Sequence, residues 1–514
     1  MGWTLKLQWL GTTFVFNEVE AIVTEAFDLF VDSPRPRSAS FDDLRLPSDI
    51  DCADLIINKG HRLVGAVAWL ELDDVEYLRG TVERPRFGAA NEPLSFSVSE
   101  APWKDSALFP PNFMITKNVR VDASELPVAE RERIDAYNAR AEELNAEGAE
   151  YGFTEIATLP YTVPKQVGRV YPIVFGTPGA AGGQPGSPAI MIDDGSVSGT
   201  VLLMIAGHAV DASTVTIWGP DAAGDLTSSA GISVSEDVDL NGRTISVVDV
   251  TAGPGTLDPT RIDDDWYAEW DDGEALPGGM GDVLELLLNV SSIRLDSARI
   301  RGIRSALNRY QLAGYIDDTV TPWEYVRREI MPLIPLAPVQ GRSGLYWVLW
   351  DPTHFEIVDH LVEGPEVVVD GLLEFSDIEA KSEVRIEYRY RPDTNKTSKA
   401  TTTHAGTSAY CALAAQRNDT GGHSIQTEIV DAKSTAGAIT TTWAAVFGFP
   451  PAILPVMCLR SRFGHRRPGD VVRVTIPSKS LVSIPALISA MAFDGSPIVA
   501  IELSILTDPI IRAI

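Results

Sequence analysis

The chain has 514 residues, 45% of them hydrophobic, and a formal net charge of -29 at pH 7. This length is too great for one hydrophobic core, and the composition is that of a folded chain rather than a disordered one. The negative charge argues against sequence-specific binding of nucleic acid and against binding to anionic lipid, because each phosphate contact needs a cation from the protein.

Residues 1–105 contain short stretches in which apolar and polar residues alternate, a pattern that favours half-buried strands in a small barrel or sandwich. The expected strands are Leu5–Trp9, Phe14–Phe16, Asp54–Asn58, Leu63–Glu71, Tyr77–Val82 and Leu94–Val98. The first of them lacks the features of a signal peptide: no charged segment precedes an apolar run, and no small-residue cleavage site follows it.

A proline-rich stretch, Ala101–Pro111, leads into Leu126–Gly152, where charged residues and alanines predict a polar helix that is exposed or crosses between domains. Residues 161–280 predict another β-rich block. Its loop Gly176–Pro188 lacks the lysine of a phosphate-binding loop, and it is interpreted as a flexible turn. The segment Asp263–Glu274 holds seven carboxylates but matches a calcium loop poorly. A solvated or partner-facing acidic loop is therefore preferred there over a cation site.

From Gly281 onward the pattern changes to helices. Asp282 is a candidate cap for the first helix, a second is expected over Asp296–Leu307, and Thr321 followed by a proline predicts the start of a third. Further strands are expected, followed by a polar linker that is mobile or draped over a surface. The strands are Leu345–Trp350, Glu366–Val369, Glu383–Tyr390 and Val471–Ile476, and the linker is Arg391–Thr407.

Ile439–Leu459 is the most apolar run, and a glycine and three prolines interrupt it, so we expect no membrane-spanning helix. The three cysteines lie far apart and offer neither a disulfide framework nor a CxxC site, which favours a soluble protein made in a reducing compartment. They are Cys52, Cys411 and Cys458.

Catalytic motifs are not found. His208, Asp211 and Ser213 include the residue types of a nucleophilic triad, but they are adjacent in sequence, whereas a triad is assembled from separate segments. We interpret His208 as a residue at a strand end. The sequence thus predicts no catalytic, cofactor-binding or metal-binding residue. A basic cluster near the C-terminus stands out and is interpreted as a hairpin tip that protects a sheet edge. The alternative is contact with an acidic neighbour such as Asp263–Glu274 of another subunit. The cluster is Arg460, Arg462, His465, Arg466 and Arg467.

About 230 residues after Gly281 resemble the tail hub (baseplate hub) proteins of long-tailed bacteriophages and gene transfer agents. The matching segments are GDVLELLLNVSSIRLDSARI (281–300), LAGYIDDTVTPWEYV (312–326) with GLYWVLWDP (344–352), and EVRIEYRYRP (383–392). Ser408, the Thr435–Trp443 helix and Gly469–Val472 then follow in the family's order.

The resemblance implies a structural, non-enzymatic protein. Some hubs of this kind hold an iron-sulfur cluster through several cysteines, but the three cysteines here are scattered, so no cofactor is expected. The resemblance also implies a homotrimer whose two small, tail-tube-like β-barrel domains per chain form a pseudo-sixfold ring that joins the sixfold tail tube to the threefold tip. The implied partners are the distal tail protein, the tip fibre or central spike protein, and the tape-measure protein. The implied location is the tail tip or baseplate of the virion, at the site of host attachment. An acidic lumen would let DNA pass during ejection without specific binding.

We therefore expect a mainly β, multidomain chain with α+β parts. Its expected parts are an N-terminal β-barrel or sandwich (1–105), a Pro-rich linker and polar helix (106–160), an inserted β-rich domain (161–280), a helical α/β domain (281–365) and a C-terminal β-barrel domain with a helix (366–514). The alternative function is a tail-associated carbohydrate-binding or cell-wall/polysaccharide hydrolase module. The chain's 11 tryptophans suggest it, and we expect Trp266 and Trp270 to be exposed. A secreted adhesin is disfavoured, since no export signal is found.

Overall fold

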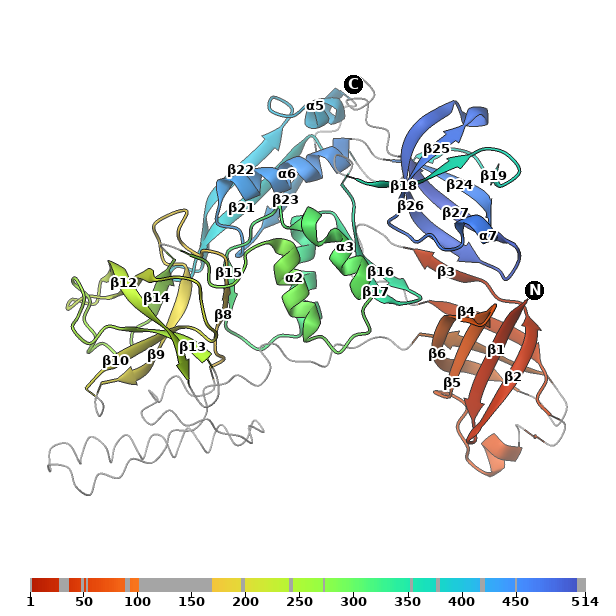
Figure 1. The fold of residues 1–514 in the computed structure, drawn as a ribbon, viewed down its shortest axis with the longest axis horizontal. Helices are drawn as coiled ribbons and strands as arrows, with labels where there is room; N and C mark the ends of the chain where they lie inside the picture. The colour runs from red at the N-terminus through yellow and green to blue at the C-terminus, as the bar shows by residue number, and fades with distance from the viewer. Residues whose placement is uncertain are drawn as a thin grey trace.

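The computed structural model describes residues 2–26, 37–47, 50–51, 54–87, 93–100, 169–195, 199–239, 244–270, 273–351, 355–375, 380–416, 421–448 and 451–505. The chain is mainly β and has several parts that form an arch, with a closed β-barrel at one end and the N-terminal sheet at the other (Figure 1). A helical middle part and a C-terminal sheet lie between them. The expected helix Leu126–Gly152, the proline-rich stretch Ala101–Pro111 and Cys52 fall outside the described residues.

The N-terminal sheet follows the alternating pattern of its sequence. In β1 the odd-numbered residues from Trp3 to Trp9 are buried, while those between them are partly or fully exposed, because alternate side chains of a strand lie on one face. Six strands pair in the order β2-β1-β5-β6-β7-β4. Their bounds are β1 (Trp3–Trp9), β2 (Thr12–Val19), β4 (Ser38–Leu44), β5 (Val67–Leu72), β6 (Val75–Arg86) and β7 (Leu94–Ser99).

Two of the strands expected here differ in the structure. Asp54–Asn58 forms a helical turn, η1, so the expected strand is wrong. The Asp51 carboxylate accepts a hydrogen bond from the Asp54 N–H at 3.0 Å, and this cap favours a helical turn over an extended backbone. The strand expected from Leu63 begins only at Val67, because the Ala66 N–H bonds to the Leu63 carbonyl and closes a turn.

One strand leaves the N-terminal sheet. β3 (Val23–Ala26) pairs antiparallel with β26 of the C-terminal sheet, with Val23 opposite Phe493, and the chain then returns to the N-terminal sheet as β4. The C-terminal sheet has a main path of six strands, β18-β25-β26-β27-β24-β19. Its elements are β18 (Ile357–Val362), β19 (Val367–Val369), β20 (Glu374–Phe375), β24 (Ala452–Leu459), α7 (Arg460–Phe463), β25 (Val471–Ile476), η5 (Pro477–Lys479), β26 (Leu481–Phe493) and β27 (Ile498–Ile505). The expected strand Val471–Ile476 is confirmed.

A single hydrophobic core joins these two sheets. The Tyr77 ring packs edge-on against the rings of Trp3 and Phe493, with centroid distances of 5.2 and 5.1 Å. The Trp3 indole N–H donates to the Ala21 carbonyl at 2.8 Å. Because side chains from both sheets fill one core, the two sheets stabilise each other.

Gly80 of β6 allows close contact between β6 and β7. A Cβ atom at this position would collide with the carbonyl oxygen of Ser99. We expect Gly80→Ala to lower the free energy of unfolding by about 1–3 kcal/mol, because strand β7 would have to shift. Urea unfolding measures this effect. The matched control is Gly422→Ala, since a Cβ at Gly422 has no atom within 4 Å, and its expected change is within about 0.5 kcal/mol. Equal effects of the two substitutions would contradict the prediction.

The part after residue 169 contains a closed barrel with strand order β10-β13-β12-β11-β14-β9. Its core is separate from that of the two sheets. The loop Gly176–Pro188 is a hydrogen-bonded turn, in which the Gly186 N–H donates to the Ala268 carbonyl at 3.1 Å. The barrel strands are β9 (Ser187–Asp194), β10 (Val201–Ala206), β11 (Thr214–Pro220), β12 (Leu226–Asp239), β13 (Thr244–Asp249) and β14 (Trp266–Glu269).

The helical middle part follows the barrel. The Thr321 hydroxyl accepts a hydrogen bond from the Glu324 N–H, as expected. The second helix, expected over Asp296–Leu307, spans Ser297–Leu307, and Asp296 is its cap. The cap expected at Asp282 is wrong, since the first helix already begins at Met280. The elements are β8 (Ile173–Phe175), α2 (Met280–Asn289), α3 (Ser297–Leu307), β15 (Gly314–Ile316), α4 (Pro322–Tyr325), η3 (Val326–Ile330), η4 (Met331–Leu333), β16 (Leu336–Gly341) and β17 (Gly344–Leu349).

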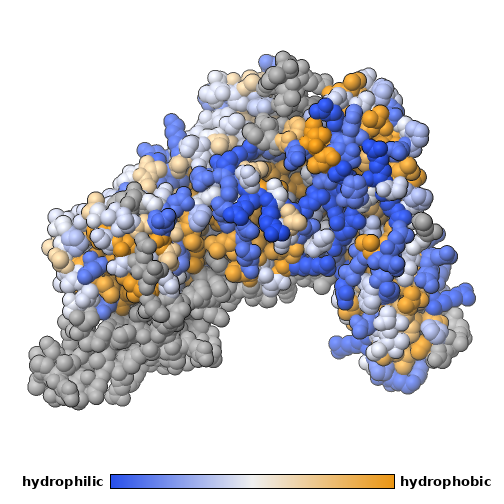
Figure 2. Space-filling model, viewed as in Figure 1, coloured by the Kyte–Doolittle hydropathy of each residue, from blue (hydrophilic) through white to orange (hydrophobic). Residues whose placement is uncertain are grey.

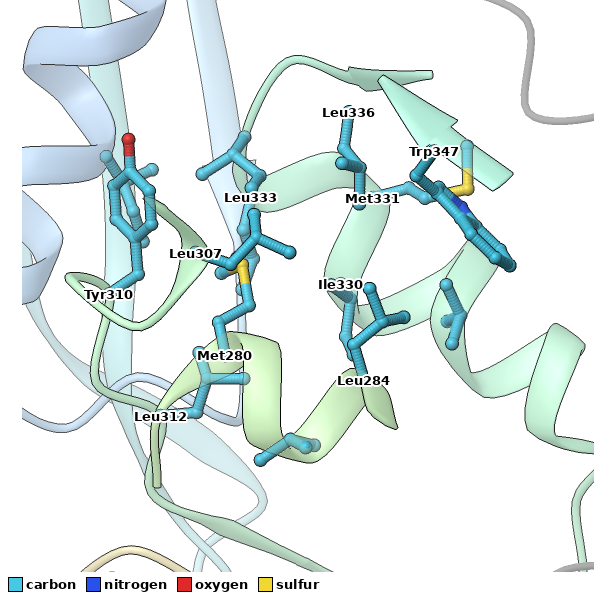
Figure 3. Packing of buried hydrophobic residues seen from close by; sticks show 14 of the residues in the cluster. Met280, Leu284, Leu307, Tyr310, Leu312, Ile330, Met331, Leu333, Leu336 and Trp347 are labelled. Carbon is cyan, nitrogen blue, oxygen red and sulfur yellow. The ribbon is translucent and has the colours of Figure 1, made fainter. Parts of the chain in front are cut away.

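Figure 3 shows how the core of this part is filled. Met280 and Leu284 of α2 lie near Leu307 of α3 and Ile330 of η3, and all four are buried. Tyr310 points toward helix α6, where its hydroxyl oxygen lies 2.7 Å from the Thr442 hydroxyl oxygen. The same core continues into the neighbouring sheet.

That neighbouring sheet has three strands in the order β22-β21-β23. The linker expected over Arg391–Thr407 is wrong, since Lys396–His404 forms strand β22 and pairs antiparallel with β21 along its length. Its threonines favour an extended backbone. The stretch expected as one domain (366–514) thus contains strands of two different sheets. The elements are β21 (Glu383–Arg391), β22 (Lys396–His404), α5 (Ala409–Gln416), β23 (Gly422–Gln426) and α6 (Lys433–Gly448).

Candidate functional site

Charged side chains meet where β3 enters the C-terminal sheet, and we call this group the Glu25 junction. Glu25 is only 1% exposed. Its Oε1 accepts a hydrogen bond from the Arg342 backbone N–H at 3.0 Å, and guanidinium nitrogens of Arg37 and Arg467 lie 3.4 Å away. Burial raises the pKa of Glu25, and the charges of Arg37 and Arg342 oppose that rise. A buried carboxyl group is stable here because a backbone N–H and guanidinium groups donate hydrogen bonds to it.

Arg342, in the turn between β16 and β17, connects the Glu25 junction to the shared core. Its guanidinium lies 5.0 Å from the centroid of the Tyr77 ring and 5.7 Å from that of Phe493. It also donates to the Gly464 carbonyl at 2.8 Å. The junction therefore links the N-terminal sheet, the helical middle part and the C-terminal sheet. Figure 2 shows hydrophilic residues gathered over the helical middle part and this neighbouring region.

The basic cluster lies beside this junction rather than at a hairpin tip. α7 contains Arg460 and Arg462 and follows β24, and β24 and β25 are not paired with each other, so the hairpin interpretation is wrong. The four arginines pair with carboxylates of the same chain: Arg460 with Asp73 (3.0 Å), Arg462 with Glu366 (3.1 Å), Arg466 with Asp359 (2.8 Å) and Arg467 with Glu25 (3.4 Å). These pairs cross between chain segments that are distant in sequence.

His208 is the second residue after strand β10, in agreement with its interpretation as a strand-end residue. Its Nε2 accepts a hydrogen bond from the Val174 N–H at 3.1 Å, and its Nδ1 lies 2.8 Å from the Ala209 carbonyl oxygen. Burial lowers the pKa of His208. Both ring nitrogens thus have backbone partners, and Asp211 forms a β-bridge with Glu274. The ring is held as part of the barrel's connection to β8.

Within the acidic segment Asp263–Glu274, strand β14 (Trp266–Glu269) is part of the barrel wall. Trp266 and Trp270 are 3% and 0% exposed, so the expectation that they are exposed is wrong. The Trp270 indole N–H donates to the Ser187 hydroxyl at 3.2 Å, and the Glu269 carboxylate accepts from the Trp218 indole at 2.9 Å. Alternation along β14 explains part of the pattern, since Trp266 and Ala268 face the core while Glu269 is partly exposed. Trp270 follows the strand directly and is buried as well.

A cavity of about 460 Å³ lies among β15, α4, η3 and the end of β21, and we call it the tyrosine pocket. It is lined by Tyr315, Ile316, Asp317, Asp318, Thr319, Val320, Glu324, Tyr325, Arg328, Glu329, Tyr390, Glu428 and Ile429. Burial raises the pKa of Asp317, and it also raises the pKa of Glu428, with a further contribution from Glu329. The segment GYIDD (314–318) brings two of these carboxylates to the pocket, and the sequence analysis did not single it out as a site.

The raised pKa of Asp317 predicts a stability effect with a definite sign. Because burial raises the folded-state pKa of Asp317 above its ordinary value, the ionised carboxylate destabilises the fold at neutral pH, and this cost disappears as the pH falls through the folded-state pKa. We expect Asp317→Asn to raise the free energy of unfolding by up to about 1 kcal/mol at pH 7, and to have no effect near pH 3.5. Urea unfolding at both pH values checks this.

The matched control is Glu363→Gln, because hydrogen bonds from Ser478 lower the pKa of Glu363. This substitution should act in the opposite direction, lowering stability at pH 7 and losing its effect as the pH falls through the lowered folded-state pKa of Glu363. An Asp317→Asn protein that is less stable than the parent at pH 7 would contradict the prediction.

Two wider observations concern the described part of the chain. None of its helices is long and apolar enough to cross a membrane. Within the same residues, no three or more His, Cys, Asp or Glu side chains are grouped so that they could hold a metal ion.

Comparisons with known proteins yield similar solved structures only. No family model and no curated protein matches the chain. A tail protein from Neisseria meningitidis MC58 is 9% identical, with 98% of this chain and 97% of that chain covered and a TM-score of 0.36. The 43 kDa tail protein of prophage MuSo2 from Shewanella oneidensis is 8% identical, with 98% of both chains covered and a TM-score of 0.38. A chain of the virion of a native gene transfer agent is 14% identical, with 61% of this chain and 79% of that chain covered and a TM-score of 0.35. At such identities and TM-scores, function must be argued from the chain's own residues.

Proposed function

We propose that this chain is a structural component of a phage tail, the hub of the tail tip or baseplate. The observation that carries the proposal is the presence of two β-sheets of similar construction. Each sheet has six strands in its main path, and the two share one core. A ring with sixfold pseudosymmetry built from three chains needs two comparable β units in each chain, and these two sheets would supply them.

The segments that carry the family resemblance also support the proposal. Residues 281–300 contain α2 except its first residue and the first four residues of α3, residues 312–326 contain β15 and α4, and residues 383–392 contain β21. They are separate in sequence, yet their buried residues belong to one core. Helices and strands that form one core in this way are expected to occur together and in the same order along the chain.

The proposed assembly is a homotrimeric ring that joins the sixfold tail tube to the threefold tip fibre or spike, at the tail tip of the virion. Its partners would be the distal tail protein, the tip fibre or central spike protein and the tape-measure protein. The net charge of -29 would suit a lumen through which DNA passes during ejection. Negative charges on the protein repel the DNA phosphates, and this repulsion prevents the DNA from adhering to the lumen wall. The role is structural rather than enzymatic.

Light scattering coupled to size-exclusion chromatography tests the assembly. We expect a mass three times that of the 55.7 kDa chain, alone or after addition of the distal tail protein, and a threefold ring in electron micrographs. A strict monomer that binds no tail protein would contradict the proposal. The alternative of a carbohydrate-binding or hydrolase module loses its main motivation, because Trp266 and Trp270 are buried.

A further inference from the structure

We propose that the tyrosine pocket binds a cationic side chain, an arginine or a lysine, of a partner protein. This inference concerns a site that the proposed tail function does not assign, and it does not depend on that function. The pocket is formed by three separate stretches of the chain, Tyr315–Glu329, Tyr390 and Glu428–Ile429.

The charge of the pocket lining is the first argument. Five of its side chains are carboxylates, namely Asp317, Asp318, Glu324, Glu329 and Glu428. Among the described residues that line it, Arg328 is the one cation, and its Nε lies 2.7 Å from Glu329 Oε1. The lining therefore keeps an excess of negative charge, and a cation in the pocket would reduce the repulsion between these carboxylates.

The second argument comes from a hydroxyl group rather than from the carboxylates. Tyr325 is 3% exposed, and its buried hydroxyl has no hydrogen-bond partner in the structure. The groups that act electrostatically on this hydroxyl include Glu329, Glu428 and Tyr315, all of which line the pocket. A buried hydroxyl without a partner costs free energy. An N–H donor placed in the pocket would give this oxygen a partner.

The shape and wall of the pocket favour an organic cation over a metal ion. Tyr315, Tyr325 and Tyr390 contribute three aromatic rings, which attract guanidinium and ammonium groups. A cavity of about 460 Å³ is larger than a bare ion needs. Within the described residues, no carboxylates are grouped closely enough to hold a metal. A guanidinium carries five N–H donors and matches several carboxylates at once.

Ligand-observed fluorine NMR on the full chain tests the proposal. The probes are trifluoroacetyl-capped tripeptides of sequence Ala-X-Ala, in which X is arginine, lysine or citrulline, because citrulline has nearly the shape of arginine without its charge. We expect the arginine and lysine peptides to bind and the citrulline peptide to bind at least about tenfold more weakly. Glu428→Gln and Tyr325→Phe should each weaken binding of the arginine peptide by about three- to tenfold.

The matched control is Glu356→Gln, which removes the same charge from an exposed position outside the pocket lining and should leave binding unchanged. Far-ultraviolet circular dichroism confirms that each variant is folded. Equal binding of arginine and citrulline peptides would overturn the proposal, as would equal loss in Glu356→Gln and Glu428→Gln. Displacement of the arginine peptide by equimolar Ca²⁺ would overturn it in favour of a metal site. Stronger binding of free spermidine than of either cationic peptide would overturn the assignment to a protein side chain.

Discussion

Replacing Glu25 with alanine is expected to lower the free energy of unfolding by about 3–5 kcal/mol. The substitution leaves the guanidinium groups of Arg37 and Arg467 without their shared acceptor in a buried site, and it removes the acceptor of the Arg342 backbone N–H. Urea unfolding followed by tryptophan fluorescence measures the loss. Because the Glu25 junction links both sheets to the helical middle part, we also expect the unfolding of the two sheets to become less cooperative.

Two further variants separate the causes of this loss. Glu25→Gln keeps an oxygen that can accept from the Arg342 N–H but lacks the charge, so its effect should be smaller than that of alanine. Glu366→Gln breaks an ion pair with Arg462 whose side chains are 50% and 49% exposed, and it should cost less than about 1 kcal/mol. If Glu25→Ala were no more destabilising than Glu366→Gln, the junction would not hold the sheets together as argued.

The second large effect is expected for Trp3→Ala. Trp3 is fully buried, packs against Tyr77 and donates its indole N–H to the Ala21 carbonyl. Its removal leaves a cavity in the core that the two sheets share, and we expect a loss of about 3–5 kcal/mol. Thermal and urea unfolding should both show it.

Trp3→Phe keeps an aromatic ring but loses the hydrogen bond, so its free energy of unfolding should lie between those of the parent and the alanine variant. Val15→Ala serves as the control, because Val15 is 53% exposed on the neighbouring strand and a surface truncation there should change stability by less than about 0.5 kcal/mol. A similar loss in Trp3→Ala and Val15→Ala would show that the shared core contributes little.

The sequence predicted those elements whose signals are local. The Val471–Ile476 strand is confirmed, because alternation and a preceding turn specify it within a few residues. The Thr321 cap and the second helix are confirmed for the same reason. The cap predicted at Asp282 is wrong, since Asp282 lies within the first turn of a helix that begins after Gly279. Boundaries are the least certain part of such predictions.

The misassigned segments depend on neighbours that are distant in sequence. Strand β22 is polar on both faces and resembles a linker, and only its pairing with β21 makes it a strand. β3 has four residues, too few for a pattern to identify its partner, β26. Trp266 and Trp270 are surrounded by carboxylates in sequence, yet both are buried, Trp266 within strand β14 and Trp270 directly after it.

The candidate sites could not be predicted from the sequence for a related reason. The Glu25 junction assembles Glu25, Arg37, Arg342 and Arg467, which are far apart in the chain. The one local signal was a carboxylate at a core-facing position of the short strand β3. The tyrosine pocket offered more, since GYIDD and the nearby Tyr325 and Glu329 are within one stretch. The contributions of Tyr390 and Glu428 required the fold.

The pairing of β3 with β26 has a consequence for how the chain folds during translation. Ala26 of β3 pairs with Ala490, which is 464 positions later. At about 5–20 residues per second, a ribosome reaches that partner roughly 20–90 s after β3 has been made. Until then Trp3 and Tyr77 lack the Phe493 ring that completes their core. The nascent N-terminal sheet therefore exposes an apolar surface during most of the synthesis of the chain. We expect chaperone binding to this surface to determine the yield of folded protein.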